Sequence, residues 1–309
     1  MQNSYDLVII GGGPAGASAA IYAARKRLKT LILAESFGGQ SVVSTDIQNW
    51  IGTVSISGEE LASALKKHME AYADETLVLK EERVNQVQGN NGKFLTITDK
   101  GSYESRAVLI AAGSRRRKIE AIGADKFEHK GLTYCASCDG PLFSGQDLVV
   151  LGGGNAAFET AAQLLAYAKS VTLINRGPDF YRADSLTVEK VLSHPNMHTI
   201  KNAEILEIKG DKFVNGLVYR DNETKETKEV ATGGIFVEIG QLPNTEFLGN
   251  LVELSKYKQI VIDPRTQKTS LPGIWAAGDC TDIFYHQNNI AVGDAIRALE
   301  DIYVTLHTR

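Results

Sequence analysis

The chain has 309 residues, of which 43% are hydrophobic and 23% are charged, and its formal net charge at pH 7 is −4. This length suits two domains of ordinary size, and the composition is typical of a globular protein that buries a sizeable core. The mild charge gives no reason to expect nucleic acid or an anionic membrane as a partner, and no apolar run in the sequence approaches the ~20 residues of a membrane-spanning helix.

A glycine-rich turn follows the first predicted strand. The sequence indicates a strand over residues 6–10, a helix over 15–26 and a strand over 30–34, which is βαβ order. The turn before the helix reads Gly11-Gly12-Gly13-Pro14-Ala15-Gly16. In such a turn the first glycine permits the tight bend, the second lets a pyrophosphate approach the backbone, and the third lets the helix pack on the strand. The helix N-terminus offers unpaired N–H groups and a partial positive charge to the phosphates.

An acidic residue stands where this motif uses one. Glu35 ends the second strand, where a carboxylate can accept hydrogen bonds from both hydroxyls of an adenosine ribose. The alternative is a structural turn with Glu35 as a solvated strand-end charge. Strand, turn, helix and acid in this order favour a dinucleotide site.

The chain continues with a second helix and a group of short strands. Apolar residues recur at helical spacing over residues 57–74, and Ser57 with Glu60 resembles a capping box. Residues 76–112 indicate several short strands that end in Ala111-Ala112-Gly113.

A second glycine turn begins another βαβ unit. A strand beginning near Asp147 leads to Gly152-Gly153-Gly154-Asn155-Ala156-Ala157, then to a predicted helix over 155–168 and a strand over 170–174. Gly152, Gly154 and Ala157 form the Gly-x-Gly-x-x-Ala variant of the same dinucleotide motif.

The remaining segments suggest one domain inserted into another. Strands are predicted around residues 204–238, whereas 259–264, 273–277 and a helix over 290–306 are typical of the end of the first domain. We therefore predict an α/β fold with two Rossmann-like nucleotide-binding domains, the second inserted in the first. The domain bounds that we predict are 1–116 with 245–309, and 117–244.

A Cys-x-x-Cys pair precedes the second glycine turn. Cys135 and Cys138 suit half a zinc site, a redox disulfide or two idle thiols. Cys280 is the only other cysteine and no pair of histidines at ligand spacing accompanies it, so redox chemistry is favoured. Asp139 follows directly and is placed to move a proton as general acid or base. Its alternative is a solvated turn residue before Gly140.

Several motifs resemble the thioredoxin reductase family of low-molecular-weight type. Gly38-Gly39-Gln40, Asp46-Ile47-Gln48-Asn49-Trp50, Ala111-Ala112-Gly113 and Gly278-Asp279 occur in the order seen in that family, over essentially the whole chain. The resemblance is especially close to the flavoprotein subunit of alkyl hydroperoxide reductase without its N-terminal domain.

The resemblance implies that residues 1–116 and 245–309 bind FAD. His286-Gln287 resembles an Arg-Gln pair near the isoalloxazine ring, with histidine replacing arginine. The expected FAD-binding residues are Gly11, Gly13, Pro14, Ala15, Gly16, Glu35, Gly39, Gln40, Asn49, Ala112, Gly113, Gly278, Asp279, His286 and Gln287.

The resemblance also assigns the catalytic residues. The position of Cys138 is the one that meets the flavin, that of Cys135 attacks the disulfide of the partner, and Asp139 matches the proton donor of the family. It further implies a homodimer and rotation of the inserted domain, for which residues 113–118 and 242–244 are the expected hinges.

The loop after the second βαβ unit bears on the choice of nicotinamide nucleotide. No acid stands at the end of the strand over 170–174, which counts against a simple NADH site. The NADPH motif of the family has three arginines, but here Gly177 replaces the middle one and one residue is inserted. NADPH is favoured, NADH stays possible, and a site without any dinucleotide would require a donor such as ferredoxin. The expected nucleotide-binding residues are Gly152, Gly154, Asn155, Ala156, Ala157, Arg176 and Arg182.

We predict an FAD-dependent thioredoxin reductase that passes electrons from NADPH through FAD and a Cys135–Cys138 disulfide to thioredoxin or a thioredoxin-like protein. The alternatives are an NADH-dependent reductase of a glutaredoxin-like and peroxiredoxin system, a ferredoxin-dependent enzyme, and a flavin-binding redox sensor without turnover. The first strand begins within a few residues of the start, so we expect no signal peptide and a cytoplasmic location.

Overall fold

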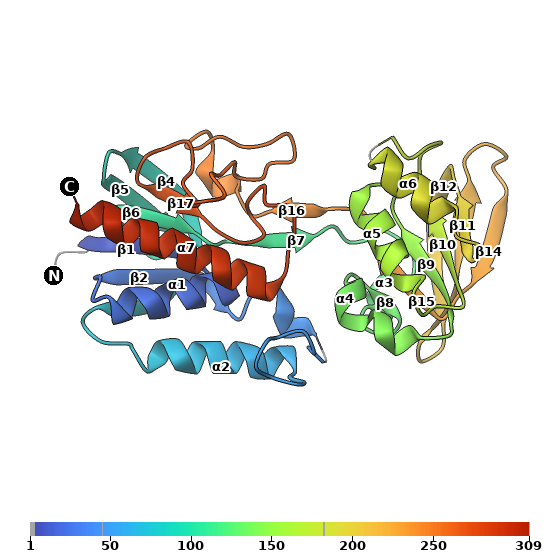
Figure 1. Cartoon of the computed structure of the whole chain (residues 1–309), viewed down its shortest axis with the longest axis horizontal. Coiled ribbons are helices and arrows are strands. Elements are labelled where there is room, and N and C mark those ends of the chain that lie inside the picture. The colour runs from blue at the N-terminus through green and yellow to red at the C-terminus, as the bar shows by residue number, and fades with distance from the viewer. Residues whose placement is uncertain (1–3, 45, 182, 309) are drawn as a thin grey trace. The chain divides into compact units, whose positions relative to one another are not determined.

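A computed structural model describes residues 4–44, 46–181 and 183–308. The chain forms two compact units (Figure 1), the first running up to Arg115 and again from Leu242 onward, the second comprising Arg116–Gln241. The chain crosses between the units at β7 (Ser114–Arg116) and β16 (Gln241–Pro243), which pair as a two-stranded sheet.

The first unit contains a largely parallel sheet. Its strands run in the order β3-β2-β1-β6-β5-β4, and β17 pairs with β6. The elements of this unit are β1 (Ser4–Gly12), α1 (Pro14–Arg25), β2 (Thr30–Phe37), η1 (Gln40–Val43), α2 (Gly58–Glu70), β3 (Leu77–Glu81), β4 (Val84–Asn90), β5 (Lys93–Thr98), β6 (Ser102–Ile110), η3 (Glu246–Leu248), β17 (Ile274–Ala276) and α7 (Asn288–His307).

Both faces of this sheet are buried, which explains the continuous apolar runs of its strands. Leu7 and Ile9 of β1 pack toward the helices α1 and α7, which lie against each other. Val8 and Ile10 pack on the opposite face, with residues such as Phe94 and Ile260. The helix α2 begins at the predicted capping box, in which Ser57 and Glu60 each bond the backbone of the other.

The second unit has a five-stranded parallel sheet and a three-stranded antiparallel one. The parallel strands run in the order β11-β10-β9-β15-β8, and the antiparallel ones in the order β12-β13-β14. The elements are α3 (Ala124–Phe127), β8 (Leu132–Thr133), α4 (Ala136–Asp139), η2 (Gly140–Phe143), β9 (Asp147–Leu151), α5 (Asn155–Leu164), β10 (Ser170–Ile174), α6 (Ser185–Leu192), β11 (Met197–Ile200), β12 (Ala203–Gly210), β13 (Val214–Asp221), β14 (Thr227–Ala231) and β15 (Gly234–Val237).

The central strand β9 separates two apolar layers of the second unit. Val149 and Leu151 contact the antiparallel sheet through residues such as Leu217. Leu148 and Val150 pack on α5, where Phe158 is fully buried.

The parallel sheets of the two units confirm the predicted fold class, α/β with one Rossmann-like unit inserted in another. Residues 259–264 lie in the first unit and form isolated bridges through Ile260. The helix predicted over 155–168 ends at Leu164 in the structure. None of the helices in the described residues combines the length and the apolar character that a bilayer crossing requires.

Candidate functional site

The first glycine turn is a close-packed backbone cradle at the carboxyl end of β1. Gly11 has φ +120°, and a Cβ there would lie 2.1 Å from the carbonyl oxygen of Ala111. A Cβ at Gly16 would lie 1.8 Å from the carbonyl oxygen of Gly11, so the third glycine lets α1 approach the turn. Gly13 caps α1 and Pro14 occupies its first turn, where no N–H donor is needed.

Further predicted flavin-binding residues lie against this turn. A Cβ at Gly39 would stand 2.9 Å from the Cα of Gly13, which places the two segments in contact. The amide nitrogen of Gln40 donates to the carbonyl oxygen and hydroxyl of Ser114. Ala112 and Gly113 follow β6, and their carbonyl oxygens accept hydrogen bonds from the side chain and backbone N–H of Asn244.

The C-terminal part of the first unit contributes a second group of predicted residues. The side-chain amide of Asn49 donates to that of Gln287 at 3.1 Å. Gly278 has φ +74°, and its missing Cβ would lie 3.5 Å from Ala15 in the glycine turn. Asp279 follows and is partly buried. The adjacent Cys280 is fully buried, and burial raises the pKa of its thiol to about 12.

Two observations fit a bound dinucleotide in this unit. A Cβ at Gly13 would meet only one atom within 4 Å, so the cradle has room on that side. The Nε2 atom of His286 is buried and has no hydrogen-bond partner among the described residues. An unpaired buried nitrogen is costly unless a ligand supplies its partner.

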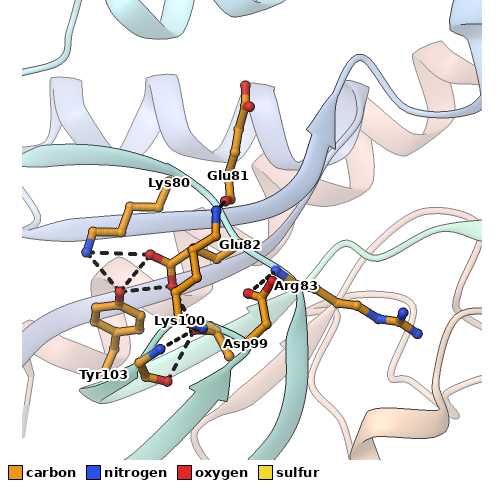
Figure 2. A network of polar contacts seen from close by, with 9 residues as sticks. Lys80, Glu81, Glu82, Arg83, Asp99, Lys100 and Tyr103 are labelled. Carbon is orange, nitrogen blue, oxygen red and sulfur yellow. Dashed lines mark hydrogen bonds and ion pairs between the residues drawn. The ribbon is translucent and has the colours of Figure 1, made fainter.

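Glu35 is exposed after the buried part of β2, at an edge supported by a buried polar network (Figure 2). The backbone N–H of Glu82 donates to the carbonyl of Ala34, directly beside Glu35. The Glu82 carboxylate accepts from the Tyr103 hydroxyl at 2.9 Å and lies 3.7 Å from the ammonium of Lys80. Figure 2 shows these three side chains pointing toward one another.

The second glycine turn lies at the carboxyl end of β9. Gly152 has φ +150°, and a Cβ there would lie 2.4 Å from the carbonyl oxygen of Glu238 and 3.0 Å from the Cβ of Ala157. Gly154 caps α5, and a Cβ there would meet nothing within 4 Å. Asn155 begins α5 and accepts from the backbone N–H of Asp184 at 2.7 Å. This open, capped turn fits a second dinucleotide.

The loop after β10 is shaped by one asparagine. The side-chain nitrogen of Asn175 donates to the carbonyl oxygens of Gly177 at 3.2 Å and Asp179 at 2.6 Å. Arg176 is exposed in this loop, whereas Arg182 lies outside the described residues.

A carboxyl group that the sequence analysis missed borders the second turn. Glu238 follows β15, and its Oε1 accepts from the hydroxyl of Thr160 on α5 at 2.8 Å. Burial raises the pKa of Glu238 to about 7, although Thr160 and Arg116 oppose the shift. Its position directly after a parallel strand is the sequence signal that could have drawn attention to it.

The dithiol segment is held by contacts within the second unit. Cys135 is partly buried, and its carbonyl accepts from the backbone N–H of Asp139 at 3.0 Å. Cys138 lies in α4, and its side chain falls outside the part of the chain that the structure describes. The hydroxyl of Thr133 donates to the carboxylate of Asp139, which fixes that side chain. Thr133 is not among the predicted site residues, because nothing in its local sequence pattern distinguishes it.

Among the described residues, no group of three or more His, Cys, Asp or Glu is arranged to hold a metal ion.

The structure thus brings the predicted residues together in two groups. The first unit gathers the glycine turn, Gly39, Gln40, Ala112, Gly113 and Gly278 around the end of β1, with Asn49 bonded to Gln287. The second unit gathers Gly152, Gly154, Asn155, Ala156 and Ala157 at the end of β9. Cys135 and Asp139 lie in this same unit.

Residues 5–298 match the family model described as pyridine nucleotide-disulphide oxidoreductase. An "NADH dehydrogenase" of Bacillus subtilis is 40% identical over 297 residues, covering 96% of this chain and 58% of that protein. One subunit of the alkyl hydroperoxide reductase of Pseudomonas aeruginosa is 41% identical over 300 residues, covering 96% of this chain and 57% of that protein. The chain therefore spans less than three fifths of the length of these curated relatives.

Solved thioredoxin reductases share the fold over the whole chain. The enzyme of Streptococcus pyogenes has a TM-score of 0.90 and 32% identity, covering 100% of both chains. That of Giardia duodenalis has a TM-score of 0.92 and 31% identity, covering 98% of this chain and 100% of the other. The resemblance inferred from the sequence is confirmed.

Proposed function

The chain belongs to the pyridine nucleotide-disulphide oxidoreductase family, and on that premise we propose that it is an FAD-dependent thioredoxin reductase that uses NADPH. A flavin and a pyridine nucleotide are the cofactors that the family and the thioredoxin reductase neighbours support. The observation that carries the proposal is the pairing of two open glycine cradles with one Cys-x-x-Cys segment.

The first unit is the proposed FAD-binding domain. The residues that would hold FAD are those of the first group, with Glu35 at the ribose and His286 offering its unpaired nitrogen. When bound, FAD supplies the ability to accept a hydride from a nicotinamide and to return two electrons to a disulfide. The second unit is the proposed pyridine-nucleotide-binding domain, through the second glycine turn and Arg176.

The proposed role of the dithiol is exchange with a carrier protein. The Cys135 thiolate attacks one sulfur of the carrier disulfide, which forms a mixed disulfide and releases the other carrier sulfur as a thiolate that takes up a proton. Cys138 then attacks the sulfur of Cys135. This step restores the Cys135–Cys138 disulfide and releases the second carrier sulfur, so the carrier gains two electrons and two protons.

Asp139 is the proposed proton carrier of these steps. Thr133 holds its carboxylate through a hydroxyl donor, and the backbone of Asp139 is bonded to Cys135. A fixed carboxyl group beside a dithiol can give a proton to a leaving thiolate and take one from an attacking thiol.

Supply of electrons to a peroxide-reducing system is a second candidate function. It is favoured by the 41% identity to the alkyl hydroperoxide reductase of Pseudomonas aeruginosa over nearly the whole chain. In this case a glutaredoxin-like protein or a peroxiredoxin would replace thioredoxin, with NADH as donor. A homodimer, a cytoplasmic location and hinges at residues 113–118 and 242–244 complete the proposal.

Anaerobic titration of the flavin-loaded protein with NADPH and with NADH tests the donor. Stoichiometric bleaching near ~450 nm, faster with NADPH, is expected. Bleaching only by dithionite would contradict a pyridine-nucleotide site and point to a protein donor.

Turnover with thioredoxin, a glutaredoxin-like protein and a peroxiredoxin tests the carrier. Cys138→Ser should abolish carrier reduction and leave the purified flavoprotein intact. Cys280→Ala is the control, because its buried thiol should be dispensable. Unchanged turnover by the Cys138 variant would contradict the proposal.

A further inference from the structure

The loop after β10 lacks the middle arginine that the NADPH motif would place at Gly177, and the neighbouring strand brings another cation to it. β10 and β11 are parallel neighbours, and Ile174 pairs with Ile200 at their carboxyl ends. The residues that follow the two strands therefore lie side by side at one edge of the sheet. The first residue after β11 is Lys201.

Three backbone hydrogen bonds fix the segment of Lys201 against the β10 loop. The N–H of Asn175 donates to Ile200 at 2.8 Å, and the N–H of Ala203 donates to the carbonyl of Asn175 at 3.1 Å. Between them, the N–H of Asn202 donates to the carbonyl of Gly177 at 3.0 Å. The backbone of Lys201 therefore lies beside Gly177, the position where the motif lacks its arginine.

An aromatic ring sets where the side chain of Lys201 lies. Its ammonium stands 4.9 Å from the ring centroid of Phe180, a cation–π geometry. Phe180 is buried and packs edge-on against Phe158 of α5, with centroids 5.0 Å apart. The ring is therefore a rigid support that orients the ammonium over this loop.

The charges of this edge are available to an anion. Lys201 and Arg176 are both exposed, and neither forms an ion pair within the part of the chain that the structure describes. The loop also carries Asp179, whose carboxylate accepts from the backbone N–H of Tyr181 at 3.4 Å. Arg176 and Lys201 thus place two cations on adjacent segments, at the point where an adenosine ribose bears its 2′-substituent in this class of fold.

We infer that Lys201 is a specificity-determining residue for the 2′-phosphate of the dinucleotide, in place of the cation absent at Gly177. This inference rests on the proposed use of NADPH. A lysine ammonium binds phosphate as a point charge and needs no bidentate geometry, so its approach from the neighbouring strand is sufficient.

Calorimetric binding of 2′,5′-ADP and 5′-AMP to the full flavin-loaded chain tests this inference without turnover. The variants are Lys201→Met, Lys201→Arg and, as a matched exposed lysine on α6, Lys190→Met. Lys201→Met should weaken the binding of 2′,5′-ADP about 10-fold or more and that of 5′-AMP less than about 2-fold. The reason is that the lost charge-assisted contact affects only the nucleotide with a phosphate on its 2′-oxygen. Lys201→Arg should retain the preference, and Lys190→Met should change neither.

The outcomes separate the inference from the function on which it rests. If the wild type prefers 2′,5′-ADP and Lys201→Met keeps that preference, Lys201 has no such role, while the proposed NADPH site stands. If the wild type binds both nucleotides equally, the NADPH proposal fails and the inference fails with it.

Discussion

The two glycine turns share a backbone design and differ at two side-chain positions. In the first, Gly16 brings α1 so close that a Cβ would collide with the Gly11 carbonyl at 1.8 Å. In the second, Ala157 occupies the same place, and its Cβ would stand 3.0 Å from one at Gly152. In the first unit the next strand, β2, carries Glu35 two residues before its end at Phe37, further back than the strand end where the sequence placed it. In the second unit the corresponding strand, β10, leads to Asn175 and Arg176.

This difference indicates how one backbone motif can serve two ligands. The turn and the helix N-terminus offer the same N–H groups to a pyrophosphate in both units. Under the proposed function, selection between the two riboses falls to the side chains at the end of the second strand of each unit, since a carboxylate accepts hydrogen bonds from free hydroxyls and a cation pairs with a phosphate. Substitutions at Gly16, Glu238, Arg176 and Tyr103 test this comparison of the two units.

Gly16→Ala should break the first turn, since backbone atoms stand where the methyl group would lie. We expect a loss of about 3 kcal/mol or more in the free energy of unfolding, together with poor flavin retention. The reciprocal control Ala157→Gly should cost only about 1 kcal/mol, the helix penalty of glycine. Urea denaturation and the flavin-to-protein absorbance ratio measure both. Equal losses in the two variants would contradict the contrast between the turns.

Glu238→Gln should remove a pH dependence from the second unit. The pKa of Glu238 is raised from 4.5 to about 7 by burial, so the folded state keeps a proton that the unfolded state loses between these values. The free energy of unfolding should therefore fall as pH rises from about 4.5 to about 7, by about 3 kcal/mol in all, and stay lower above that range. Denaturation series at pH 5 and pH 8 measure the free energy of unfolding, and the Glu238→Gln variant should show a smaller difference between the two pH values than the wild type. The exposed Glu189→Gln on α6 is the control, and identical pH profiles for wild type and the Glu238 variant would contradict the assignment.

Arg176→Met should raise the NADPH concentration at half-saturation about 10-fold and leave that for NADH within about 2-fold. The reason is that only NADPH carries the phosphate that an exposed guanidinium would bind. Steady-state kinetics with both nucleotides provide the measurement, with Lys190→Met as control. An equal loss for both nucleotides would mean that Arg176 supports the loop and does not select the ribose.

Tyr103→Phe should loosen the edge beside Glu35 without touching the second unit. The hydroxyl is buried between Glu82 and Lys80, and its loss should lower the free energy of unfolding by about 1 kcal/mol. Tyr5→Phe is the control, because no hydrogen bond of the Tyr5 hydroxyl is present among the described residues. Thermal denaturation measures the loss of stability in both variants. A larger loss in the Tyr5 variant would mean that the hydrogen bonds of Tyr103 drawn in Figure 2 contribute little to stability.

The parts of the fold that sequence reasoning predicted are those encoded by local patterns. The two strand–turn–helix units follow from apolar runs next to glycines, and α2 follows from its capping box. The short elements α6 and β11 were not predicted, because their few apolar residues give too brief a period.

The contacts that refine the candidate site could not be predicted in the same way. Glu238 meets Thr160 across 78 positions, and Lys201 reaches the β10 loop only because β11 pairs with β10. Such pairs depend on strand order and register, which no single stretch of sequence specifies. The glycines, cysteines and arginines of the site could be predicted from their motifs. The residues that contact and orient them are known only from the folded chain.

The insertion of the second unit affects the order in which the protein can fold during synthesis. All of Arg116–Gln241 has been made when the first unit still lacks β17 and α7. β17 pairs with β6, and α7 covers α1 beside the first glycine turn. On the ribosome, the inserted second unit can therefore complete its fold before the first unit does. The first glycine turn gains its last neighbouring elements only when residues 274–307 emerge.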